Sequence, residues 1–219
     1  MNRISIAISM TTTRMFPFVT FLGVTVLIQS AITSLAQENL SAKINSQISG
    51  VQRAGYPTRL DELDRWYPSV PAAENAATVL SDGYSRLRLS DSATAKLPFF
   101  SAGSLPARGE ALPADSAKNV PDLLNQNQAA LELIRKGSKF AKCRYPIDLT
   151  KGADAELPHL SKLRDAARLL LLRAMTGFGE NPQSAVESLS DCFALAKSLE
   201  AEPLLISQLV RIGLQHLST

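Results

Sequence analysis

Apolar side chains recur at helical spacing through the last third of the chain. A row with a member every three or four positions is typical of a helix that buries one face. A Gly-Glu-Asn-Pro break at 179–182 interrupts this row, so the pattern predicts two helices folded back on each other and a third helix after them. The row consists of Leu160, Leu163, Leu170, Ala174, Ala185, Leu189, Ala196 and Leu199, and it continues with Leu205, Leu209, Ile212 and Leu217.

The break at 179–182 has the chemistry of a tight turn between helices. Asn181 is a good N-cap, because its side-chain oxygen can accept a hydrogen bond from a backbone N–H of the first turn. Pro182 suits the first helical position. Since the chain ends at Thr219 with no later helix, we expect the apolar face of the third helix to stay uncovered and to receive a protein partner.

Two further groups of helices precede this region. Residues 37–87 begin with an apolar stripe that predicts a first helix ending at Gly55. A short helix should close at Pro68, and Pro71 should open another that runs to about Leu87. Pro121 opens one more helix, which should end between Gly137 and Phe140. The stripe of the first helix consists of Leu40, Ile44, Ile48 and Val51.

Residues 88–120 lose all periodicity and are rich in Ser, Ala, Gly and Pro. Loops of this length in compact domains are usually functional or disordered. The apolar Leu97-Pro98-Phe99-Phe100 segment favours a strap laid across the helices, which would form part of a ligand groove. A disordered linker is the alternative.

These elements predict an all-α protein of antiparallel helix pairs, arranged as helical hairpins or a solenoid-like array, with a long extended strap. The sequence pattern does not alternate between strands and helices, which argues against an α/β enzyme fold. We predict one helical domain over residues 37–219, divided into helices at 37–87, the strap at 88–120 and helices at 121–219.

The first 36 residues have the pattern of an export signal. Arg3 and Arg14 precede an uncharged stretch, residues 15–37, and Ser34 and Ala36 suit a cleavage site before Gln37. The alternative is a retained membrane anchor, because about 20 apolar residues can cross a bilayer. Either prediction places the domain outside the cytoplasm, in the periplasm or beyond, with membrane contact only through residues 15–37.

The net charge and the two cysteines bear on the possible partners and on a disulfide. The 219 residues carry a net charge of +3, and loss of residues 1–36 removes two arginines and no acid, leaving 21 basic and 20 acidic residues. A near-neutral chain gives no reason to expect a nucleic acid partner. Export would allow a disulfide between Cys143 and Cys192, although two separate buried thiols are equally compatible with the sequence.

A basic run follows the helix opened by Pro121. If the helix continued through it, residues 135, 139 and 142 would share one face, and an anionic lipid or envelope polymer could bind there. A solvated helix face is the plain alternative. Neighbouring cations would lower the pKa of a free Cys143, but no second cysteine is near, and we interpret His159 and His216 as structural. The run consists of Arg135, Lys136, Lys139, Lys142 and Arg144.

The densest carboxylates lie between residues 61 and 74. Paired carboxylates perform acid and base chemistry in glycoside hydrolysis, and Trp66 and Tyr67 could stack on a sugar. The alternatives are ordinary surface ion pairs for the acids and a core position for the aromatic residues. The carboxylates are Asp61, Glu62, Asp64 and Glu74.

No metal, nucleotide or nucleophile motif is present in the sequence, so we predict no catalytic, metal-binding or cofactor-binding residue. Four segments, residues 56–77, 143–146, 157–160 and 204–212, read YPTRLDELDRWYPSVPAAENAA, CRYP, LPHL and LLISQLVRI. They resemble segments of a family of uncharacterised bacterial exported proteins, and the resemblance implies export and helices without an activity. We therefore predict a non-catalytic extracytoplasmic interaction or scaffold module, with an envelope-polymer or glycan hydrolase as the alternative.

Overall fold

The computed structural model describes residues 37–95, 97–100 and 112–217. Within these ranges the regular structure is helical and no residue belongs to a strand, so the predicted all-α class is confirmed. Contacts divide the chain into two compact units, Met1–Thr58 and Arg59–Thr219. Each unit is described by itself.

In the first unit, residues 37–53 are helical and end at a glycine cap. Gly55 has a φ of +82°, which glycine adopts without steric cost. The N–H groups of Tyr56 and Gly55 donate to the carbonyls of Val51 and Gln52 at 3.2 and 2.9 Å, the pattern of a Schellman motif. The predicted helix end is therefore confirmed. The apolar stripe of this helix is exposed at Leu40, Ile44, Ile48 and Val51.

The predicted signal or anchor, residues 1–36, lies outside the described residues. Among the helices of the described ranges, none combines the length and the apolar content needed to cross a bilayer.

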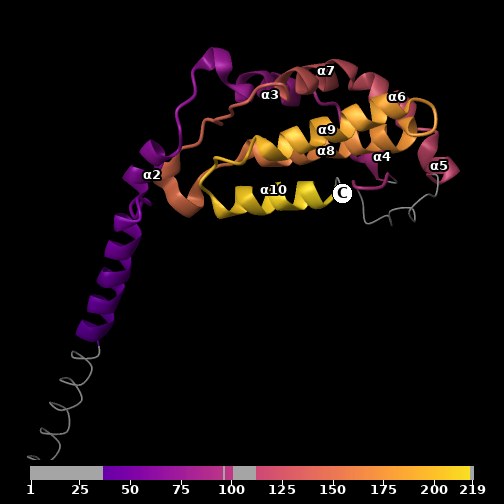
Figure 1. Ribbon diagram of the computed structural model, residues 1–219. Coiled ribbons are helices and arrows are strands. Elements are labelled where there is room, and N and C mark those ends of the chain that lie inside the picture. Colours follow the sequence, from indigo (N-terminus) through magenta and orange to yellow (C-terminus); the bar gives the residue numbers. More distant parts are fainter. Residues whose placement is uncertain (1–36, 96, 101–111, 218–219) are drawn as a thin grey trace, which may run out of the picture. The chain divides into compact units, whose positions relative to one another are not determined.

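The second unit contains short helices followed by three long ones (Figure 1). In chain order they are α2 (Leu60–Trp66), the 3-10 helix η1 (Ala72–Glu74), α3 (Ala76–Ser85), α4 (Asp91–Thr94), α5 (Ala114–Ala117), α6 (Val120–Gln126), α7 (Gln128–Gly137), the 3-10 helix η2 (Leu149–Asp154), α8 (Pro158–Gly177), α9 (Pro182–Lys197) and α10 (Leu205–Leu217).

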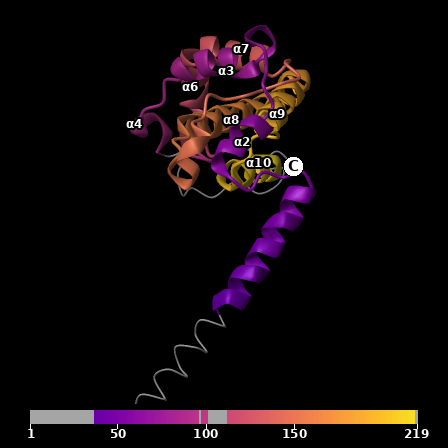
Figure 2. The ribbon, with the colours of Figure 1, turned by 90° about the vertical axis from the view of Figure 1, so that its left-hand side faces the viewer.

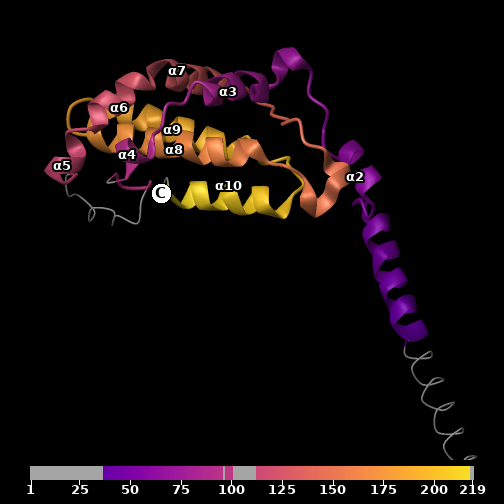
Figure 3. The same ribbon diagram turned by 180° about the vertical axis from the view of Figure 1, so that it is seen from behind.

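The second unit is layered around the hairpin of α8 and α9. The paired helices α3 and α7 lie on one side of the hairpin and α10 lies on the other, as the end-on view in Figure 2 and the rear view in Figure 3 show. Four consecutive residues of α8 are at most 3% exposed, although they point in four directions around the helix. α8 is thus the central helix of the core. The four residues are Leu169, Leu170, Leu171 and Leu172.

Small side chains fill many of the buried positions of the hairpin. The Asn181 side chain accepts a hydrogen bond from the Ser184 N–H at 3.1 Å, so the predicted cap and turn are confirmed. The Ala185 nitrogen lies 4.0 Å from the place where a Cβ would stand on Gly177, so the helices approach closely beside the turn. The small buried residues are Ala166, Ala167, Ala174, Ala185, Ser188 and Ala196.

The helix predicted from Pro71 to Leu87 is interrupted at Asn75. Asn75 has an extended backbone, with φ −93° and ψ 111°, and separates η1 from α3. Its amide accepts from the Ala77 and Arg144 N–H groups and donates to the Arg144 carbonyl at 2.9 Å. Asn75 therefore caps α3 and also clamps it to a segment 69 residues away.

The helix predicted from Pro121 onward is likewise two helices, α6 and α7, which meet at Asn127. The Asn127 side chain is fully buried and accepts from the Arg88 N–H at 2.7 Å. It donates to the carbonyls of Arg88 and Leu123 at 3.0 and 2.8 Å. The predicted helix is thus interrupted at a polar residue whose side chain is hydrogen-bonded to another segment.

The predicted strap is partly confirmed. Leu97 is buried, and Phe99 and Phe100 pack against the core, as expected for a segment laid on the helices. The strap is not wholly irregular, however, because Ser90 caps α4 by accepting from the Ala93 N–H. A second short helix, α5, follows, and residues 101–111 lie outside the described ranges.

Candidate functional site

The basic run does not form the predicted helical face. α7 ends at Gly137, so Lys139 and Lys142 lie beyond it, and the prediction that residues 135, 139 and 142 share a face is wrong. The amide of Ser138 closes the helix by donating to the Ile134 carbonyl at 2.8 Å. The chain then leaves the helix to run past Asn75.

Three of the five cations in the run are neutralised by carboxylates. Arg135 pairs with Glu187 at 2.5 Å, Lys142 with Glu74 at 2.8 Å, and Arg144 with Asp64 at 2.6 Å. Arg144 also donates to the Tyr67 carbonyl and stacks 4.3 Å from the centre of the Tyr67 ring. Within the described chain, Lys136 and Lys139 have no ion pair. An anionic partner for this patch stays a prediction.

Three of the four carboxylates proposed for hydrolysis are held in ion pairs. Asp64 and Glu74 bind the basic run, while Asp61 binds Arg59 at 2.9 Å and Arg65 at 3.9 Å. These three carboxylate side chains are 55–57% exposed, which is typical of surface ion pairs.

Tyr67 and Trp66 lie in opposite environments despite being adjacent. Tyr67 is 1% exposed and belongs to the core, whereas Trp66 is 45% exposed. The core prediction therefore holds for the tyrosine and is wrong for the tryptophan.

The two cysteines are free thiols in the structure, without the disulfide between them. Cys192 is fully buried in α9. Burial raises the pKa of the Cys143 thiol from 9.0 to about 12, and the nearby Glu202 carboxylate acts in the same direction. Cys143 is therefore a protonated thiol near neutral pH, and the neighbouring cations do not make it a thiolate.

This pKa predicts slow alkylation. At pH 8 the native chain should react with iodoacetamide at Cys143 at least about a hundredfold more slowly than a free cysteine, because thiolate is the reactive form. Between pH 9 and about 12 the folded chain holds a proton that the unfolded chain has released, so the free energy of unfolding should fall as the pH rises. Labelling followed by mass spectrometry measures the rate, with urea-unfolded chain as the control. Native labelling at the unfolded rate would contradict the prediction.

A buried polar network surrounds this thiol. The Tyr145 hydroxyl lies 3.1 Å from the Tyr84 hydroxyl and 3.2 Å from the Ser198 hydroxyl, and the Tyr145 N–H donates to the Tyr67 hydroxyl at 3.1 Å. Burial raises the pKa of all three tyrosines. Each tyrosine therefore stays a neutral phenol, suited to holding the segment around Tyr145 against α3 and the end of α9.

His159 lies at the edge of this network and binds Glu202. The ring stacks on Tyr145 with 4.1 Å between centroids, and its Nε2 lies 3.0 Å from a Glu202 carboxylate oxygen. We assign Nε2 as the donor, because a carboxylate offers only acceptors. Ser207 also donates to Glu202. This group ties α8 to the start of α10.

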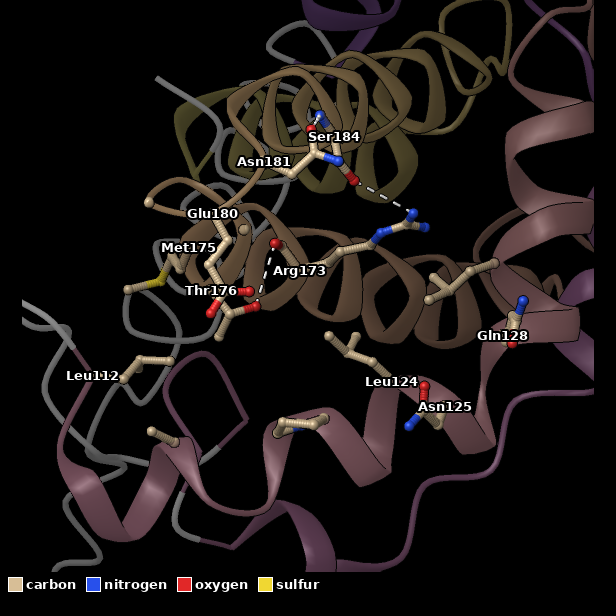
Figure 4. Close-up of a pocket in the computed structure, with 15 residues that line it drawn as sticks. Leu112, Leu124, Asn125, Gln128, Arg173, Met175, Thr176, Glu180, Asn181 and Ser184 are labelled. Carbon is tan, nitrogen blue, oxygen red and sulfur yellow. Dashed lines mark hydrogen bonds between the residues drawn. The ribbon is translucent and has the colours of Figure 1, made fainter.

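A cavity of about 240 Å³ lies beside Cys143, and two cavities elsewhere in the second unit are larger. The first, of about 840 Å³, lies between α6 and the turn from α8 to α9 (Figure 4). The second, of about 450 Å³, is a groove between α8 and α10. Within the described ranges, no group of three or more metal-ligating side chains is present.

The outer face of α10 is apolar. Ser207 and Leu214 are buried on the inner face, whereas five large aliphatic side chains on the rest of the helix are 44–75% exposed. α10 contains no acidic residue. The groove beside it is lined by Arg164 and Arg168 of α8. The exposed side chains are Leu205, Ile206, Leu209, Ile212 and Leu217.

The sequence analysis placed a ligand groove at the strap, and Leu112 and Ala117 of the strap do line the larger cavity. It did not predict the helical side of this cavity. Arg173, the one cation in the apolar run from Leu169 to Met175, is the signal that could have indicated it. Its partners across the cavity come from residues 112–131 and from the start of α9, a juxtaposition that only the fold reveals. Comparisons of the chain with known protein families, with curated proteins and with solved structures find no match.

Proposed function

We propose that the protein is a non-catalytic interaction module that binds an amphipathic helix of another protein on α10. The observation that carries this proposal is the row of five exposed aliphatic side chains on one helix. Contiguous apolar surface of this kind is uncommon on soluble monomers and usually marks a binding site. An amphipathic helix in an apolar groove is a frequent mode of peptide recognition.

The charges around α10 favour a partner helix with acidic flanks. Arg164 and Arg168 line the groove, and among the described residues Arg168 pairs with Asp165 at 3.2 Å whereas Arg164 has no ion pair. Carboxylates beside the apolar face of the partner would complement these groups.

The site of action proposed is outside the cytoplasm, on the basis of the signal or anchor pattern in residues 1–36. The hydrolase alternative is less well supported, because Asp61, Asp64 and Glu74 are paired with separate cations at the surface. Glycoside hydrolysis needs two carboxylates that face one substrate. We therefore favour binding over hydrolysis.

A double substitution, Leu209→Ser with Ile212→Ser, tests the binding surface. It should weaken binding of a helical peptide of about 18 residues, with a leucine face flanked by glutamates, at least about tenfold, because two apolar contacts are lost. Both side chains are about half exposed, so the fold should be retained. Fluorescence anisotropy of the labelled peptide measures the affinity, and circular dichroism checks the fold.

Val186→Ser on α9 is the matched control, because Val186 is 52% exposed and lies on another helix. It should leave binding unchanged. A peptide of the same composition without an apolar face, and one with lysine flanks, should both bind more weakly. Equal binding by the lysine peptide, or full binding by the double variant, would refute the proposal.

A further inference from the structure

The larger cavity joins an apolar wall to a single guanidinium. Leu124 comes from α6, Leu131 from α7 and Met175 from α8, while Arg173 extends from α8 toward Ser184 at the start of α9 (Figure 4). A volume of about 840 Å³ lies within the range of pockets that hold small molecules. The cavity therefore has both the size and the amphipathic lining of a ligand site.

Arg173 is poorly satisfied by the described residues. Arg173 is half-buried, and its hydrogen bond to the Ser184 hydroxyl spans 3.5 Å, longer than the about 2.7–3.2 Å of an ordinary N–H to O bond. No described carboxylate lies within ion-pair distance of it, whereas the partly buried Arg135 and Arg144 each bind one. A guanidinium offers five donors, and its planar fork matches a carboxylate. Arg173 is one of the residues that line the cavity, so a ligand there could use these donors.

The remaining charge in the lining indicates how much negative charge a ligand should carry. The cavity contains no lysine, and its other charged group is the exposed Glu180 carboxylate, whose side chain extends away from the Arg173 guanidinium (Figure 4). A doubly charged phosphate would keep one negative charge that no cation in the lining neutralises. One negative charge is the better match, and the amides of Asn125 and Gln128 can hydrogen-bond polar groups of a ligand.

We propose that this cavity binds a small monocarboxylate with an apolar body. The carboxylate lies on Arg173, and the body packs against Leu124, Leu131 and Met175. This site is separate from α10, so it adds a small-molecule ligand to the protein partner proposed above.

Binding of octanoate to the full chain, measured by isothermal titration calorimetry, tests the site. Affinity should rise about threefold for each methylene added from hexanoate to decanoate, because the body is buried. Octanamide and octyl phosphate should each bind at least about tenfold more weakly, since one lacks the charge and the other carries too much. Failure of octanoate to bind, or equal binding of octanamide, would overturn the proposal.

Arg173→Gln should weaken octanoate binding at least about tenfold, because the charge-assisted bonds are lost. Lys162→Gln, at an exposed cation on the same helix outside both cavities, is the matched control and should bind normally. Unchanged binding by the folded Arg173→Gln variant would refute the assignment, and the chain-length series tests the cavity even if that variant does not fold. The α10 double variant should still bind octanoate, so the two proposals can fail independently.

Discussion

Replacing His159 with alanine is expected to lower the free energy of unfolding by about 3–5 kcal/mol. His159 and Glu202 are 9% and 1% exposed, and the imidazole is the nitrogen partner of the carboxylate at 3.0 Å. Without the imidazole, Glu202 still accepts a hydrogen bond from the Ser207 hydroxyl. It loses its principal partner, however, and it remains buried from water. The loss of stacking on Tyr145 adds to the cost. Urea unfolding followed by circular dichroism measures the difference.

Two companion variants separate the polar contact from the loss of volume. His216→Ala, at an exposed position near the end of α10, should cost less than about 1 kcal/mol. Glu202→Gln should lower the free energy of unfolding less in the His159→Ala background than it does alone. The reason is that the Glu202 carboxylate has already lost its imidazole partner in that background. Additive costs in this double-mutant cycle would show that the contact contributes little.

The second large effect is expected for Asn127→Ala, which should cost about 2–4 kcal/mol. The fully buried amide makes three hydrogen bonds, two of them to the backbone of Arg88. Alanine leaves those backbone groups without their partner. It also removes the contact that holds Arg88 at the junction of α6 and α7. Thermal and urea unfolding both measure the loss.

Asn125→Ala is the matched control, since the same side chain two residues earlier is exposed on α6. It should change stability by less than about 0.5 kcal/mol. If the two variants were equally stable, the Asn127 hydrogen bonds would not contribute to the fold.

This pair of asparagines shows how far sequence reasoning reaches. The α8–α9 hairpin, its Asn181 cap and the Gly55 helix end were predictable, because each depends on residues within a few positions of one another. Asn125 and Asn127 are identical in type and neighbourhood, so periodicity could not show which one breaks the helix. That choice depends on Arg88, which lies 39 residues earlier.

The candidate site was less predictable for the same reason. The basic run looked like a free cationic face, but Arg144 and Lys142 meet their carboxylates across 80 and 68 residues. The His159–Glu202 contact spans 43 residues. Long-range pairing of this kind leaves no periodic mark in the sequence. The apolar residues of α10 were predictable, by contrast, because their helical spacing is contained within one helix.

The small buried side chains of α8 and α9 restrict which sequences this fold can accept over evolutionary time. Enlarging Ala185 or Ser188 would overpack the core, at a typical cost of about 1–3 kcal/mol. Exposed positions of the same helix, such as Val186 and Phe193, carry no such restriction. Substitutions in α9 should therefore accumulate at the exposed positions, which recur every three or four residues. The buried positions of Ala185 and Ser188 should keep small side chains.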